Sequence, residues 1–270
     1  MRPRLDADRI AEYSETGYLF PIDALGRTEV RRCMAGYEGI AGALGGSPKA
    51  VQMSQIHRYY RWAWDLCRHP KVLDAVESVI GPDVMLWSAQ VFPKRARDPG
   101  FVTMHQDGTY WGLDGGEVVT AWVALTESTV RNGCMRLLPG SHRLSILPHR
   151  DTYEEGNLLT RGQVVQAAYE EADVVDVELR PGQMSLHHVK AIHGSHANSS
   201  DRPRVGVAIR YMTPDVRPER PGQVSVLVRG RDRFGNWTLQ TDPPRFPSLE
   251  SAVRAHQAEA ERFVADLTRD

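Results

Sequence analysis

A series of short β-type segments separated by tight turns is the feature that most limits what this chain can fold into. The segments are rich in β-branched and aromatic residues, and pairs such as Pro139-Gly140, Pro181-Gly182 and Pro221-Gly222 separate them. Many short strands with such turns are typical of an antiparallel sandwich or barrel. The expected strands are Val84 to Phe92, Val118 to Leu125, Val174 to Leu179, Met184 to His188, and Arg204 to Met212.

Helical patterns flank this β region on both sides. Asp6 is a candidate N-cap for a helix through about Tyr13, and apolar residues recur at helical spacing from Pro70 to Ile80. A third helix, from about Ser248, has one apolar face that would pack on the body of the protein or on a second subunit, so a homodimer is one expected arrangement. Helices outside a many-stranded core predict a mainly β fold with flanking helices, a double-stranded β-helix or cupin-like jelly roll.

We expect a single domain over residues 1–270, with a helical part at 1–82, a β-helix core at 83–230 and a C-terminal helix at about 248–268. Lysine and arginine number 33 against 34 acidic residues, and this balance argues against nucleic acid as a partner. Neither a signal-peptide pattern nor a membrane-spanning apolar run is visible, so we expect a cytoplasmic protein without a membrane partner. The cysteines, Cys33, Cys67 and Cys134, form no paired motif and are expected to be reduced.

Three residues form a candidate metal site. His105 and Asp107 are separated by one residue, so in an extended strand both would point to the same face while Gln106 points away. His193 is the candidate third ligand. Two histidines and one carboxylate on one face of a metal leave coordination positions open for oxygen chemistry, as in non-haem Fe(II) oxygenases.

Arg204 gives this site a more specific interpretation. It lies eleven residues after His193 and opens a β segment, and a hairpin would place the two strands side by side. A planar guanidinium binds a carboxylate bidentately, and here it would hold the far carboxylate of 2-oxoglutarate. Gly206 and Ala208 share the face of Arg204 by strand alternation, so we expect that face to be an open cavity wall.

Several separated motifs resemble the phytanoyl-CoA dioxygenase (phytanoyl-CoA hydroxylase-like) family. They are EYSETGYLF, HQDGTYWGL, VTAWVALTEST, NGCMRLLPGSHR and IHGSHANSSDRPR, which together extend over most of the chain. The resemblance implies a double-stranded β-helix that uses Fe(II), 2-oxoglutarate and O2. It implies that His105, Asp107 and His193 bind the metal, that Arg204 binds 2-oxoglutarate, and that Trp122 and Ser195 lie beside this cosubstrate.

The presence of Asp107 favours hydroxylation, since related halogenases have a small residue in its place. We therefore expect a dioxygenase that hydroxylates an unactivated C–H bond of a small metabolite or natural-product intermediate and converts 2-oxoglutarate to succinate. Desaturation or cyclisation with the same cofactors is an alternative outcome. A zinc or manganese hydrolase or isomerase on a cupin-like barrel, and a non-catalytic jelly-roll binding module, are alternatives of other kinds.

Other polar and aromatic residues are candidates for substrate contact. Aromatic faces would suit a cationic substrate, and a polar or amine-bearing metabolite is preferred over a lipid thioester. His187 and His188 lie on opposite faces of a strand, so both are expected to be structural or to support the ligands. The candidate substrate residues are Gln90, Tyr110, Trp111, His57 and Arg210.

Overall fold

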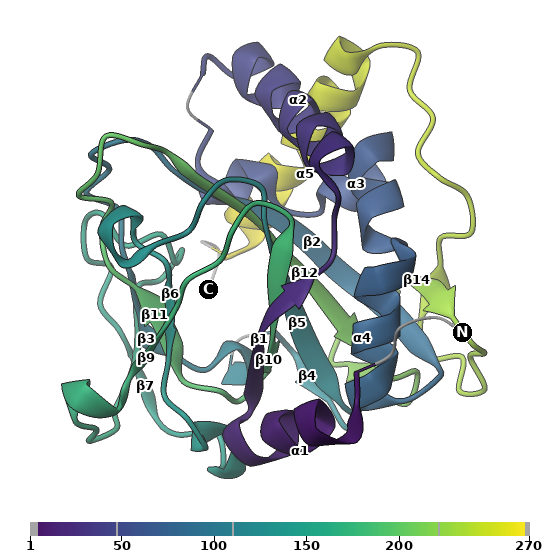
Figure 1. The fold of residues 1–270 in the computed structure, drawn as a ribbon. Coiled ribbons are helices and arrows are strands. Elements are labelled where there is room, and N and C mark those ends of the chain that lie inside the picture. Colours follow the sequence, from purple (N-terminus) through teal and green to yellow (C-terminus); the bar gives the residue numbers. More distant parts are fainter. Residues whose placement is uncertain (1–4, 47, 110, 221, 268–270) are drawn as a thin grey trace.

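The structure, a computed structural model, describes residues 5–46, 48–109, 111–220 and 222–267, with the side chains of the last helix described as far as residue 261. Two facing β-sheets form the centre of the molecule, and helices cover one outer side (Figure 1). This arrangement confirms the predicted jelly-roll fold with flanking helices.

The larger sheet has seven strands and contains four of the five predicted strands. All its neighbours pair antiparallel except the last two. The order across the sheet is β1 (Tyr18–Asp23), β10 (Gln183–His188), β5 (Val118–Ala124), β12 (Arg204–Met212), β2 (Val84–Lys94), β14 (Val224–Arg229) and β15 (Thr238–Leu239).

The smaller sheet has four short strands and faces the larger one. Its order is β3 (Val102–His105), β11 (His193–Ser195), β6 (Met135–Leu137) and β9 (Val175–Val177). Two further strand pairs lie outside both sheets: β4 (Leu113–Asp114) with β13 (Arg217–Pro218), and β7 (His149–Asp151) with β8 (Gln163–Val165).

The described residues form five α-helices, which include the three that the sequence predicted. Asp6 caps the first helix as expected, because its carboxylate accepts a hydrogen bond from the Arg9 amide at 2.9 Å. The helices are α1 (Ala7–Thr16), α2 (Arg27–Ala43), α3 (Arg61–Cys67), α4 (Pro70–Ile80) and α5 (Leu249–Leu267). The first part of the chain is not purely helical, since β1 joins the edge of the large sheet.

The apolar face of α5 packs on the same chain. Ala252 and Val253 are buried, and the buried His256 hydrogen-bonds Tyr60 Oη through Nδ1 at 2.9 Å. Of the two packings expected for this helix, its described side chains therefore adopt the one on the body of the protein. The three cysteines are free and buried, as predicted.

Strand β12 separates the apolar core from the space between the sheets. All nine of its residues are buried. Val205, Val207, Ile209 and Tyr211 belong to the large core cluster that includes helices α3 and α4, which confirms the predicted alternation. The opposite face of β12 points toward the smaller sheet.

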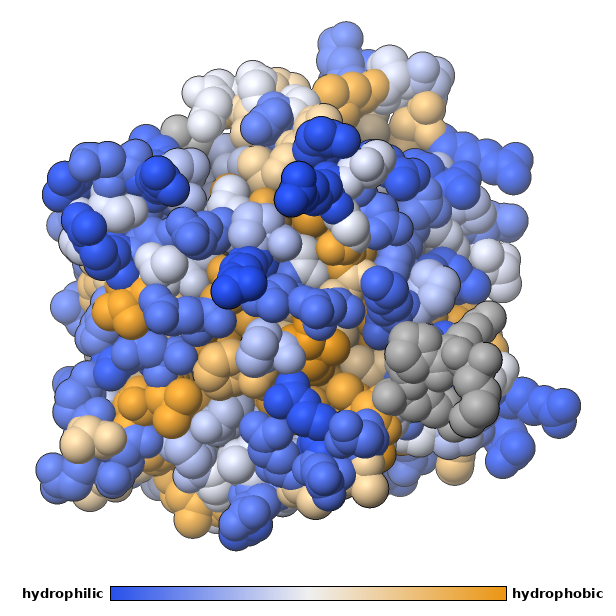
Figure 2. Space-filling model, viewed as in Figure 1, coloured by the Kyte–Doolittle hydropathy of each residue, from blue (hydrophilic) through white to orange (hydrophobic). Residues whose placement is uncertain are grey.

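Hydrophilic side chains cover most of the molecular face seen in Figure 2. None of the described helices is both long and apolar enough to span a bilayer.

Candidate metal and cosubstrate site

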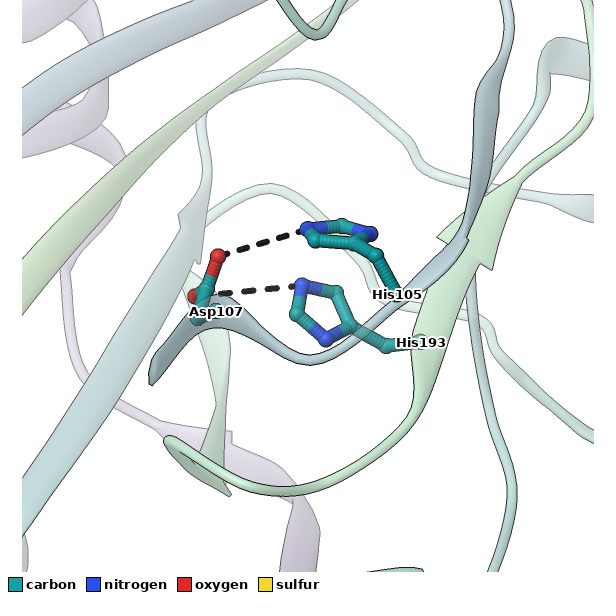
Figure 3. A group of neighbouring side chains, drawn as sticks. All are labelled: His105, Asp107 and His193. Atoms are coloured by element: carbon teal, nitrogen blue, oxygen red, sulfur yellow. Dashed lines mark hydrogen bonds and ion pairs between the residues drawn. The ribbon is translucent and has the colours of Figure 1, made fainter. Parts of the chain in front are cut away.

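His105, Asp107 and His193 come together between the two sheets (Figure 3). His105 is the last residue of β3 and pairs directly with His193 of β11, so the two rings lie with centroids 4.3 Å apart. One potential ligand atom from each of the three residues lies within 4.8 Å of the others. All three side chains are buried. The structure therefore assembles the predicted set from strands far apart in sequence.

A turn, rather than the predicted strand alternation, brings Asp107 to the histidines. Strand β3 ends at His105, and Asp107 begins a short 3-10 turn through Thr109. The buried Gln106 points away as expected and holds this turn. Its Oε1 accepts from the Leu147 amide at 2.8 Å, and its Nε2 donates to the Lys190 carbonyl at 2.9 Å. Hydrogen bonds from a neighbouring side chain thus fix the position of the carboxylate.

Backbone carbonyls orient both imidazoles. Nδ1 of His105 donates to the Thr103 carbonyl at 2.9 Å, and Nδ1 of His193 donates to the Ala191 carbonyl at 3.0 Å. In this tautomer a neutral ring presents the lone pair of Nε2 toward Asp107, at 3.3 Å for His105 and 3.9 Å for His193. The two lone pairs and the carboxylate are all hydrogen-bond acceptors, and no donor from the described residues lies between them. This arrangement of acceptors fits a bound divalent cation.

The pKa values of His193 and Asp107 favour the protonation states in which these side chains can bind a metal. Burial, together with the nearby His105, lowers the pKa of His193 to about 4, so its ring is neutral at pH 7. Burial alone would raise the pKa of Asp107, but its electrostatic interactions with His193, His105 and Arg210 lower it instead. Asp107 is thus a carboxylate at neutral pH, as ligation requires.

A cavity of about 540 Å³, its open mouth included, extends from this triad between the sheets. Both sheets contribute side chains to its wall, including Phe92, Thr120, Trp122, Met135, His187, Ser195, Arg204, Ala208 and Arg210. The cavity brings together the predicted metal residues, the three predicted cosubstrate residues and one predicted substrate residue.

The predicted hairpin between the strands of His193 and Arg204 is wrong. Strand β11 pairs with β3 and β6 in the smaller sheet, whereas β12 pairs with β2 and β5 in the larger one. The loop between them crosses from one sheet to the other. Arg204 and His193 therefore meet across the cavity rather than along one sheet.

Arg204 is a buried cation that needs an anion. Its side chain is 4% exposed, and no carboxylate among the described residues forms an ion pair with it. Nε of Arg204 also has no hydrogen-bond partner among the residues that the structure describes. Burial lowers the pKa of Arg204 to about 10, which still leaves the guanidinium charged at neutral pH. An isolated buried charge is costly, so a bound carboxylate would stabilise this end of the cavity.

Trp122 lies against Arg204, with the guanidinium carbon 5.4 Å from the ring centroid. Gly206 makes this contact possible, because a Cβ there would lie 2.0 Å from Cζ2 of Trp122. The prediction that Gly206 opens the cavity is therefore wrong: the indole of Trp122 fills the space above it. Ala208, the next residue on that face, does line the cavity.

Lys94 is a candidate site residue that the sequence did not reveal. It pairs with Arg204 across β2 and β12 and is completely buried. Its Nζ donates to Ser195 Oγ at 2.7 Å and to the carbonyl of His196. Burial, reinforced by the charge of Arg204, lowers the pKa of Lys94 to about 6. The predicted strand ended at Phe92, two residues before the end of β2, so Lys94 was not expected beside Arg204.

The two adjacent histidines of β10 point in opposite directions, as predicted. His187 lines the cavity, with its ring centroid 4.7 Å from that of His193. Neither ring nitrogen of His187 has a hydrogen-bond partner among the described residues. His188 points outward, where its Nε2 lies 3.5 Å from Glu117 and its Nδ1 accepts from the Lys190 amide.

The predicted substrate residues divide into two groups. Arg210 contacts two of the others: its Nη1 donates to Gln90 Oε1 at 3.3 Å, and its guanidinium carbon is 4.9 Å from the Trp111 ring centroid. His57 is buried in the short 3-10 turn Ile56–Arg58 and does not line the described cavity. Tyr110 lies outside the described residues.

Comparison with known proteins shows what this chain is similar to. The model of the family described as phytanoyl-CoA dioxygenase matches residues 13–206, a range that contains the triad and Arg204. A probable phytanoyl-CoA dioxygenase from Caenorhabditis elegans is 29% identical over 161 residues, covering 57% of this chain and 51% of that protein. A probable alpha-ketoglutarate-dependent hypophosphite dioxygenase from Stutzerimonas stutzeri is 29% identical over 168 residues, covering 60% of this chain and 57% of that protein. The chain thus spans about half the length of the curated relatives it matches.

Among solved structures, a protein described as the non-heme monooxygenase ThoJ is similar over nearly the whole chain. It is 34% identical with a TM-score of 0.78, and the match covers 96% of this chain and 100% of that one. The alpha-ketoglutarate-dependent carbocyclase SnoK, at 24% identity and a TM-score of 0.65, shares the fold.

Gly206→Ala tests the close packing of Trp122 on Gly206. The added methyl group cannot coexist with the present indole position, so we expect a loss of roughly 1–3 kcal/mol in the free energy of unfolding. Gly42→Ala is the matched control, since a Cβ at Gly42 in α2 would meet no atom within 4 Å. Urea denaturation of both variants checks this, and equal stability of the two would contradict the close contact.

His57→Leu tests the electrostatic cost of a buried histidine. Burial lowers the pKa of His57 to about 3, whereas an unfolded histidine takes up a proton below about pH 6.5. Below about pH 6.5 the unfolded state therefore binds more protons, and the protein loses stability as the pH falls. Replacing His57 should reduce the loss between pH 6.5 and pH 5 by about 2 kcal/mol. Urea denaturation at several pH values measures this, and an unchanged pH dependence would refute it.

Proposed function

The chain belongs to the phytanoyl-CoA dioxygenase family, and from this premise we propose that it is an Fe(II)- and 2-oxoglutarate-dependent dioxygenase that hydroxylates an unactivated C–H bond of a small molecule. One observation carries the proposal: a complete His, Asp and His set shares a cavity with the buried Arg204, which has no carboxylate partner among the described residues. The substrate would be a small metabolite or a natural-product intermediate.

His105, Asp107 and His193 would hold Fe(II). Their ligand atoms converge from one side, and two neutral imidazoles with one carboxylate are the donors that non-haem Fe(II) oxygenases use. The hydrogen bonds from the two Nδ1 atoms to backbone carbonyls keep both rings in the orientation required for ligation. Gln106 does the same for the turn that carries Asp107.

Arg204 would bind the far carboxylate of 2-oxoglutarate. Its guanidinium can form two parallel hydrogen bonds to a carboxylate, and its buried position strengthens the attraction. Ser195 lies on the same cavity wall, and Lys94 fixes its hydroxyl through the 2.7 Å hydrogen bond. Trp122 packs against the guanidinium and would limit the positions that the cosubstrate can adopt.

When bound, the iron and the cosubstrate supply the oxidising chemistry: O2 and 2-oxoglutarate are consumed, one oxygen atom enters succinate as CO2 leaves, and the other enters the substrate C–H bond. The residues of the chain bind and orient the reactants and keep bulk water from the reacting bond. Asp107 occupies the position whose carboxylate is absent in related halogenases, which supports hydroxylation. The similarity to a protein described as a non-heme monooxygenase also supports this outcome.

The other interpretations account for fewer residues. A zinc or manganese hydrolase or isomerase could use the same three ligands but would leave Arg204, Ser195 and Lys94 without a role at the cavity wall. A non-catalytic binding module would not require two imidazoles and a carboxylate to present lone pairs to one point. No specific observation favours desaturation or cyclisation over hydroxylation.

Asp107→Ala tests the cofactor assignment. Anaerobic protein mixed with Fe(II) and 2-oxoglutarate should develop the visible charge-transfer absorption of an iron chelate, and Asp107→Ala should weaken or remove it because one ligand is lost. Asp114→Ala, at an exposed aspartate that pairs with Arg217, should leave the absorption unchanged. Absence of the absorption in the wild-type protein would refute the proposed function.

Arg204→Gln tests the position of the cosubstrate. Removing the cation should weaken 2-oxoglutarate binding by roughly 100-fold. Lys94→Met, which removes the hydrogen bonds to Ser195 and to the His196 carbonyl, should weaken it by about tenfold. Titration of the charge-transfer absorption measures both affinities. A 2-oxo acid without the far carboxylate should bind the wild-type and Arg204→Gln proteins equally. A normal 2-oxoglutarate affinity in Arg204→Gln would contradict the assignment.

A further inference from the structure

A second buried arginine lies at another part of the same cavity. Arg210 is on the same strand, β12, and on the same face as Arg204, and its side chain also lines the cavity. It is 8% exposed, and no carboxylate forms an ion pair with it among the residues that the structure describes. Its Nε has no hydrogen-bond partner in the same set of residues.

The surroundings hold the Arg210 guanidinium in one orientation. Gln90 accepts its Nη1 hydrogen bond, and the Gln90 amide is itself fixed because Nε2 donates to the Ala50 carbonyl at 2.9 Å. The guanidinium carbon lies 4.9 Å from the Trp111 ring centroid and 5.9 Å from that of Phe92. Trp111, one of the aromatic residues expected to attract a cationic substrate, is therefore already next to a cation.

Asp107 is the acidic residue that acts on Arg210 electrostatically, and it raises the pKa that burial lowers. If Asp107 binds a divalent metal, however, its negative charge is compensated by the metal. Because Asp107 also forms no ion pair with it, Arg210 is a buried cation without a paired anion among the described residues whether or not the metal is bound. A ligand that brings a negative charge would remove this imbalance.

The cosubstrate would use both of its carboxylates elsewhere, one at the metal and the other at Arg204. Six residues of strand separate the two arginines, a backbone distance of roughly 20 Å. The five-carbon chain of 2-oxoglutarate would extend from the metal toward Arg204 and would leave Arg210 available. The anion at Arg210 must then belong to another molecule.

We propose that the substrate carries an anionic group, a carboxylate or a phosphate, that binds Arg210 next to Gln90 and Trp111. The proposal rests on the proposed function, because only an enzyme has a substrate. Binding of an anion at Arg210 does not itself require iron. The bond to be oxidised lies between this anionic group and the metal. Arg210 therefore selects the substrate by charge and positions it along β12.

Binding of a simple probe tests the anion site in the metal-free protein. Benzoate and benzamide have the same shape and differ in charge, and Trp87 and Trp111, whose ring centroids are 4.9 Å apart, should report binding near Arg210 by fluorescence. The background is Arg204→Gln, so that the cosubstrate position does not bind the probe. We expect a saturable response to benzoate and none to benzamide. Adding Arg210→Gln should lower the affinity for benzoate by on the order of 100-fold.

Two further variants separate charge from structure. Arg210→Lys keeps the positive charge and should retain a weaker benzoate response. Arg68→Gln is the matched control, because Arg68 also lies over a tryptophan, Trp64 at 5.5 Å, but outside the cavity. A benzoate response that survives Arg210→Gln, or an equal response to benzamide, would overturn the proposal.

Turnover extends the test to the whole site. Matched pairs of carboxylic acids and their amides are screened for stimulation of succinate release, and we expect the acids alone to stimulate, with the effect lost in Arg210→Gln but not in Arg68→Gln. A large increase in the 2-oxoglutarate KM of Arg210→Gln would instead assign Arg210 to the cosubstrate and overturn the proposal. If wild-type protein forms no iron chelate, the proposed function fails, while the benzoate experiment still decides whether Arg210 binds anions.

Discussion

The direct pairing of His105 with His193 is the interaction on which the rest of the site depends. Antiparallel pairing of β3 and β11 places the two imidazoles side by side, and it needs no side-chain contact between them to do so. Once the rings are adjacent, backbone carbonyls at Thr103 and Ala191 fix their orientation. The only remaining requirement is a carboxylate opposite their Nε2 atoms, and the turn held by Gln106 provides it. The metal site is thus a consequence of sheet register.

Strand β12 determines the rest of the cavity. One of its faces packs into the apolar core, which fixes the strand, and the other carries Arg204 and Arg210 into the space between the sheets. The rigid strand keeps the two cations too far apart to bind one small anion together. Trp122 occupies the space above Gly206, and Ala208 leaves space that remains part of the cavity. A single strand therefore defines where a cosubstrate and a second anion would bind relative to the metal.

Features with local causes could be predicted from the sequence, and features that depend on strand partners could not. The bounds of β12 and α4 follow from alternation, helical spacing and a Gly-Pro stop, all of which are local. The candidate metal residues could be proposed because their types and spacing are chemically specific, and the structure brings them together. The sequence could not show that β11 and β12 join different sheets, because that depends on long-range pairing. Lys94 was missed for the same reason: its importance comes from lying opposite Arg204 and beneath Ser195.

The most direct test of the account is a crystal structure of the protein grown without oxygen in the presence of Mn(II) and 2-oxoglutarate. The account predicts one metal ion bound by Nε2 of His105, Nε2 of His193 and the carboxylate of Asp107. It also predicts a 2-oxoglutarate molecule whose far carboxylate binds Arg204, with Arg210 left free of it. A metal bound elsewhere, or a cosubstrate whose far carboxylate binds Arg210, would contradict the account.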